Sequence, residues 1–236
     1  MITIRRSQER GHANHGWLNT YHTFSFASYY DPAHMGFRSL RVLNDDRVAP
    51  NKGFGAHAHR DMEILTYVLD GSLMHKDSMG EKRVFGPNTV QTMSAGTGVV
   101  HSEFNASETD PVRFLQIWIE PAVQDVQPSY QQIPFDPSEK AGRLRLLAGP
   151  KEVSNGHAAV IQQDALVYAA VLGAGETLKQ SVAPGRHAYV QVARGDLSLN
   201  GQTLAEGDGA AISSESDLSF AGAGPNGSEF LFFDLA

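Results

Sequence analysis

Two short histidine-containing stretches hold the side chains best suited to chemistry in this chain. The stretch GFGAHAHRDMEIL, residues 53–65, contains His57 and His59 two positions apart. The later stretch AGTGVVHSEFN contains His101 and Glu103 at the same spacing. Imidazole and carboxylate groups are protein ligands for iron, nickel, copper and zinc. The two pairs are therefore either halves of one metal site or ordinary polar residues on solvent-facing strands.

The spacing decides which element can present each pair. Residues i and i+2 point about 200° apart on a helix, but they share one face of a β-strand, roughly 6.6 Å apart. Two such strands would direct three imidazoles and one carboxylate at a single centre. Glu63 is the rival carboxylate, but on a straight strand it lies roughly 13 Å beyond His59. We expect Glu103 to be the fourth ligand and Glu63 to be a neighbouring or core group.

Composition narrows the class of protein and the kind of site. The 236 residues include no cysteine, which excludes disulfides, thiolate nucleophiles, thiolate zinc sites and iron–sulfur clusters. The 19 basic and 26 acidic residues give a formal charge of −7, and no basic run stands out, so direct nucleic-acid binding is disfavoured. No apolar stretch has the length of a signal peptide or membrane span. We expect a cytoplasmic protein with no membrane contact.

The pattern of apolar runs predicts an all-β fold. Short runs rich in β-branched and aromatic residues alternate with Gly and Pro turns along nearly the whole chain. Residues 120–143 hold four prolines and few apolar side chains, so we interpret them as a connecting segment, with a short helical turn within 135–145. The run at 188–212 repeats the strand and turn rhythm of 64–93 but lacks any His-x-His. Two similar barrels, one with a site, are the working prediction.

The motifs resemble those of a known family. HAHRDME is similar to the first metal motif of cupins, and GVVHSEFN is similar to the second. RGHANHGWL, HTFSFASYYDP and HKDSMG resemble the pirins, the bicupin subfamily, over nearly all of residues 1–135. The resemblance implies two tandem cupin-type β-barrels, with a metal-binding barrel at 1–132 and a barrel without metal ligands at 133–236. It also implies a metal held by His57, His59, His101 and Glu103.

Three other side chains receive structural interpretations. His75 lies in GSLMHKDSMG, which we interpret as a solvated hairpin tip. Gln116 and Trp118 share one face of a predicted strand with Phe114, and we expect that face to fill the core rather than line a pocket.

The resemblance implies a quercetin 2,3-dioxygenase, which opens flavonols with O2 and releases carbon monoxide. Its metal would be Fe(II), with Ni, Co, Mn, Cu or Zn as alternatives, and Glu103 would be the general base for the flavonol hydroxyl. The alternative function is a redox-responsive regulator that binds a protein partner. A closed structural zinc site is a third interpretation. We expect a monomer, because two fused barrels already supply the partner barrel that cupins need.

Overall fold

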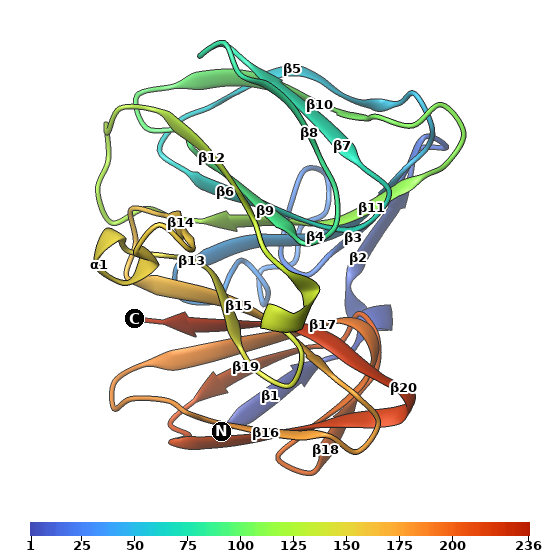
Figure 1. Cartoon of the computed structure of the whole chain (residues 1–236), viewed down its shortest axis with the longest axis vertical. Helices are drawn as coiled ribbons and strands as arrows, with labels where there is room; N and C mark the ends of the chain where they lie inside the picture. The colour runs from blue at the N-terminus through green and yellow to red at the C-terminus, as the bar shows by residue number, and fades with distance from the viewer. The chain divides into compact units, whose positions relative to one another are not determined.

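Almost every regular element in the computed structural model, which describes residues 1–236, is a β-strand (Figure 1). The chain divides into two compact units. The N-terminal unit is Gly11–Pro134 with Ala159–Gln163, and the C-terminal unit is Met1–Arg10, Phe135–Ala158 and Asp164–Ala236. No helix has both the length and the apolar character needed to cross a membrane. The prediction of a mostly β chain is confirmed.

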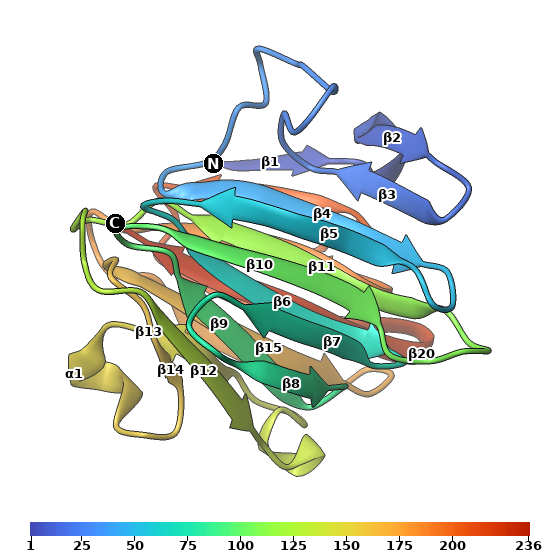
Figure 2. The same ribbon diagram turned by 90° about the horizontal axis from the view of Figure 1, so that it is seen from above.

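The N-terminal unit is built from two antiparallel sheets. One is seven-stranded, in the order β12-β9-β6-β11-β4-β3-β2, and the other is four-stranded, in the order β5-β10-β7-β8 (Figure 2). The strands are β2 (Gly11–Asn14), β3 (Leu18–His22), β4 (Leu40–Val48), β5 (Gly53–His59), β6 (Glu63–Asp70), β7 (Leu73–Asp77), β8 (Lys82–Phe85), β9 (Thr89–Ser94), β10 (Val99–Asn105), β11 (Val112–Ile119) and β12 (Ser129–Pro134), and the unit also contains the short β14 (Ala159–Val160).

The two sheets of this unit pack face to face. Val68 and Phe114 of the seven-stranded sheet share one apolar cluster with Leu73 and Phe85 of the four-stranded sheet. All four side chains are at most 5% exposed, and burying one such side chain contributes about 1.5–3 kcal/mol. Phe54 of β5 packs against this cluster, and β10 pairs with β5 and β7. The core therefore supports the two strands that carry the His-x-His and His-x-Glu pairs.

The C-terminal unit has a sheet and a core of its own. Its sheet runs β1-β19-β17-β20-β15-β13, with β16 on β20 and β18 on β17. Phe220, Phe230 and Phe232 pack together in its core. The elements are β1 (Ile2–Arg5), η1 (Ser7–Glu9), η2 (Pro137–Glu139), β13 (Arg145–Gly149), α1 (Lys151–Ser154), β15 (Ala165–Leu172), β16 (Thr177–Ser181), β17 (His187–Leu199), β18 (Gln202–Leu204), β19 (Gly209–Ser213) and β20 (Asp217–Leu235).

The segment 120–143 is more regular than its composition predicts. Ser129–Pro134 forms β12, which pairs with β9 at the edge of the seven-stranded sheet. For these residues the prediction of a connecting segment is wrong, because an edge strand tolerates polar side chains and flanking prolines. The division between the two units does fall within the segment, between Pro134 and Phe135. The predicted helical turn is a 3-10 turn, η2, capped by the Asp136 side chain. The assignment of metal binding to residues 1–132, with no metal ligands in residues 133–236, stays a prediction.

Candidate metal centre

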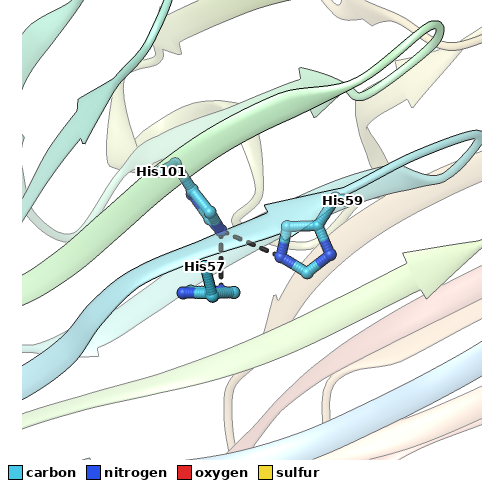
Figure 3. A group of neighbouring side chains, drawn as sticks. All are labelled: His57, His59 and His101. Atoms are coloured by element: carbon cyan, nitrogen blue, oxygen red, sulfur yellow. Dashed lines mark hydrogen bonds between the residues drawn. The ribbon is translucent and has the colours of Figure 1, made fainter.

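Strand geometry brings three histidine rings together. His57 and His59 lie two apart on β5, and antiparallel pairing with β10 places His101 directly opposite His57. The Nε2 atom of His101 lies 3.0 Å from the Nε2 atoms of both His57 and His59 (Figure 3). The i, i+2 spacing on a strand therefore directs these rings at one point, as the sequence predicts.

The donor set fits a divalent transition metal. Two nitrogens bound at right angles to one ion at about 2.1 Å lie about 3 Å apart, close to the observed Nε2 separations. His57 Nδ1 lies 2.8 Å from the carbonyl oxygen of Gly55, so an Nδ1–H can donate there and leave a lone pair on Nε2. Burial, with the neighbouring rings, lowers the pKa of His59 to about 4 and that of His101 to about 2. Both rings are therefore neutral and able to bind a cation.

Glu103 lies beside this group rather than within it. It follows His101 by two residues on β10, and its carboxylate lies within 4.8 Å of ring nitrogens of His75 and His101. It also lines a pocket together with His57 and His59. Burial, reinforced by the charge of Asp46, raises the pKa of Glu103 to about 7. The assignment of Glu103 as fourth ligand stays a prediction, because its carboxylate is grouped with His75 and His101 and not with all three rings.

Glu63 belongs to the core. It begins β6 in the seven-stranded sheet, is 1% exposed and accepts a 2.6 Å hydrogen bond from the hydroxyl of Ser94. Burial raises its pKa. The chain leaves the four-stranded sheet after His59, so Glu63 does not continue the strand that carries the ligands.

His75 is not at a solvated hairpin tip, and that interpretation is wrong. Its side chain is fully buried on β7, where it is paired opposite Glu103 of β10. The tip of this hairpin is the turn that follows Asp77. Glycines at both ends of GSLMHKDSMG gave the whole stretch the composition of a loop. The signal that could have revealed the strand is the two-residue spacing of His75 and Asp77. Residues at that spacing share one face of a strand, as His101 and Glu103 do.

A pocket opens beside the three rings. It is a small cavity of about 50 Å³ that opens to solvent. Its wall residues, besides His57, His59 and Glu103, are Phe26, Asn44, Asp46, Phe54, Gln116 and Trp118. The expectation that this face fills the core is confirmed for Phe114 and in part for Trp118, which packs against a second core cluster. It is wrong in excluding a pocket, because Gln116 and Trp118 both line one. The Trp118 ring meets that of His59 edge-on, with centroids 4.9 Å apart.

Comparison with known proteins identifies the family. The pirin family model matches residues 3–119, and the model of the quercetinase C-terminal cupin domain matches residues 146–235. The chain is 45% identical over 235 residues to a quercetin 2,3-dioxygenase of Escherichia coli K12, covering 100% of this chain and 99% of the relative. This chain belongs to the pirin family.

Other relatives are similar to this chain in sequence or structure over most of their length. A putative quercetin 2,3-dioxygenase of Pseudomonas aeruginosa is 45% identical over 218 residues, covering 92% of this chain and 93% of the relative. The crystal structure of bacterial pirin YhhW from Escherichia coli in complex with nickel(II) superposes with a TM-score of 0.92 at 42% identity, covering 100% of this chain and 99% of that one. The family match therefore gives this pirin two cupin domains.

Proposed function

We propose that this pirin is a metal-dependent dioxygenase that cleaves flavonols such as quercetin with O2 and releases carbon monoxide. The observation that carries the proposal is the convergence of His57, His59 and His101 beside an aromatic-lined pocket, whose wall includes the first two of these rings. The full-length relatives named quercetin 2,3-dioxygenase support the same activity.

Four side chains would hold the metal in this proposal: His57, His59, His101 and Glu103. A bound divalent ion supplies a Lewis acid with open positions and, for iron, a redox couple. We propose Fe(II) as the physiological ion. The nickel(II) complex of the Escherichia coli pirin supports nickel as an alternative, and the same donors also suit Co, Mn, Cu and Zn.

We assign Glu103 the role of general base, which takes the proton of the flavonol 3-hydroxyl. The hydroxyl of Thr66 lies 3.4 Å from Glu103 Oε1, so we assign the proton transfer to Oε2. A carboxylate oxygen that faces the substrate can accept a phenolic proton and release it afterwards. The deprotonated, electron-rich ring is then the species that reacts with O2.

The rest of the pocket wall orients the substrate and excludes water. Phe26, Phe54 and Trp118 offer flat apolar surfaces to a planar aromatic ligand. Asn44, Asp46 and Gln116 offer polar atoms to its ring hydroxyls. We infer that each cupin domain closes into a barrel and that residues 133–236 bind no metal. We propose a monomer as the working unit, because the chain already holds two cupin domains.

The test is O2 uptake with quercetin after the protein is stripped and reloaded with Fe(II), Ni(II) or Mn(II). We expect metal-dependent uptake with release of carbon monoxide. His57→Ala should abolish it, while His157→Ala, the same change at an exposed histidine of the C-terminal unit, should leave it intact. Stoichiometric metal binding without uptake under any ion would overturn the dioxygenase function and favour the regulatory alternative.

A further inference from the structure

Behind His101, two buried side chains continue the site away from the pocket. His75 Nδ1 lies 3.5 Å from His101 Nδ1, on the opposite edge of the His101 ring from the Nε2 that faces His57 and His59. The other nitrogen of His75, Nε2, lies 2.8 Å from Asp77 Oδ2. The side chains of His75 and Asp77 are both fully buried. Asp77, His75 and His101 therefore form one continuous polar chain.

The far end of this chain has a fixed orientation. Asp77 Oδ1 accepts hydrogen bonds from the backbone N–H groups of Met79 and Glu81, at 2.8 and 3.1 Å. Oδ2 is then the oxygen that faces His75, and a carboxylate oxygen can only accept. His75 must therefore carry its proton on Nε2.

The proton position on His75 in turn determines the proton position on His101. A neutral His75 with its proton on Nε2 presents a lone pair at Nδ1. If His101 carried its proton on Nε2, two lone pairs would face each other across 3.5 Å in a buried site. A proton on His101 Nδ1 instead makes a long N–H···N contact and leaves the Nε2 lone pair facing the other two rings.

We propose that Asp77 and His75 are positioning residues that fix the tautomer of His101, so that its Nε2 is available to bind the metal. The proposal rests on the metal site of the proposed function. It assigns His75 a supporting role and not that of a ligand. Its Nε2 is hydrogen-bonded to Asp77, and its Nδ1 faces the Nδ1 edge of His101, away from the Nε2 that would bind the metal.

The substitution Asp77→Asn keeps the shape of the side chain but reverses the direction of the hydrogen bonds that run through His75 to His101. The two backbone N–H groups retain the amide oxygen at the Oδ1 position, so the NH2 group faces His75 Nε2. His75 must then accept at Nε2 and carry its proton on Nδ1, which drives the proton of His101 onto Nε2. The metal-binding lone pair is lost, and we expect Ni(II) affinity to fall by about 10- to 100-fold.

A double variant separates this effect from simple damage. In Asp77→Asn with His75→Phe, no ring constrains His101, which can again place its lone pair on Nε2. We expect Ni(II) affinity to recover relative to Asp77→Asn alone. If His75 were a ligand, the double variant would instead bind more weakly than the single one. Glu81→Gln is the matched control, because it removes a nearby charge but keeps the backbone N–H to Asp77.

The deciding measurement is the tautomer of each ring in the metal-stripped full chain, read from long-range ¹H–¹⁵N spectra of protein with ¹⁵N-labelled histidine. We expect protons on Nε2 of His75 and Nδ1 of His101, and the reverse for both in Asp77→Asn. The opposite wild-type assignment, or unchanged tautomers and Ni(II) affinity in a folded Asp77→Asn, overturns the proposal. If that variant does not fold, the wild-type spectrum decides.

The two proposals fail in different ways. Expected tautomers in a protein that takes up no O2 with quercetin would sustain the positioning role while the dioxygenase function failed. Active, metal-loaded protein with the opposite tautomers would do the reverse.

Discussion

Glu103 is the acidic side chain on which the proposed chemistry depends. Its position two residues after His101 makes it both a candidate ligand and the candidate base. In Glu103→Gln the amide cannot accept the phenolic proton, so we expect quercetin-dependent O2 uptake at saturating metal to fall by about 10²–10⁴-fold. Glu63→Gln is the matched control, since that buried side chain can still accept from Ser94. Wild-type turnover in Glu103→Gln would remove the general-base role.

Asp46 is a second buried carboxylate on the pocket wall, and one of its oxygens, Oδ1, has no hydrogen-bond partner. Burial raises its pKa to about 7, although a hydrogen bond from Thr20 opposes the shift. Because this pKa exceeds that of the unfolded chain, the folded protein binds more protons between about pH 4 and 7. Its contribution to stability is therefore full at low pH and is lost as the pH rises through about 7.

The substitution Asp46→Asn should remove this loss. We expect the metal-stripped variant to match the wild type near pH 4 and to be more stable near pH 8 by about 1–4 kcal/mol. Urea unfolding at the two pH values measures both quantities. Glu103 contributes a slope of the same sign, so the pH dependence should shrink rather than vanish. An unchanged slope would show that Asp46 does not titrate as this burial requires.

The pairing of β5 with β10 is the feature of the sheets that sets the site geometry. The register shifts between His101 and Glu103, a bulge that re-aims side chains on the ligand strand. Gly53 makes the close approach possible, because a Cβ there would lie 2.2 Å from the carbonyl oxygen of Glu103 and 2.5 Å from the Cα of Phe104. The spacing of the candidate ligands thus depends on Gly53, which is not itself a candidate ligand.

We therefore expect Gly53→Ala to force β5 away from β10. The change should cost about 1–3 kcal/mol of unfolding free energy and weaken metal binding, because His57 and His59 move with β5. Gly55→Ala is the matched control, since nothing lies within 4 Å of a Cβ at that position. Chemical unfolding and Ni(II) titration of both variants provide the test. Equal metal affinity in the two variants would contradict it.

The elements also show where sequence reasoning succeeds and where it stops. The convergence of His57, His59 and His101 follows from the two-residue period of a strand, which the sequence states directly. The burial of His75 does not, because it depends on β12, whose Tyr130 ring lies 4.6 Å from the His75 ring. That strand is polar, so its sequence predicts a connecting segment instead. Burial by a strand that is distant in sequence leaves no pattern in the residues around His75.

At the scale of the whole molecule, each unit has its own apolar core, and only the N-terminal unit supplies the three converging rings. Binding that requires the folded N-terminal unit must stabilise it by mass action. At a free Ni(II) concentration about 100 times the dissociation constant, the gain is about 2.7 kcal/mol. For a chain of this size that corresponds to an increase of about 5–10 °C in the melting temperature of the unit that holds the site.

The measurement is thermal unfolding with and without Ni(II), followed by tryptophan fluorescence. Both tryptophans, Trp17 and Trp118, lie in the N-terminal unit, so this signal reports on the unit with the site. His57→Ala should lose most of the shift, because one of the three nitrogens is gone, whereas His157→Ala should retain it. An equal shift in His57→Ala would mean that the ion stabilises the protein from another place, and the three-histidine centre would lose its support.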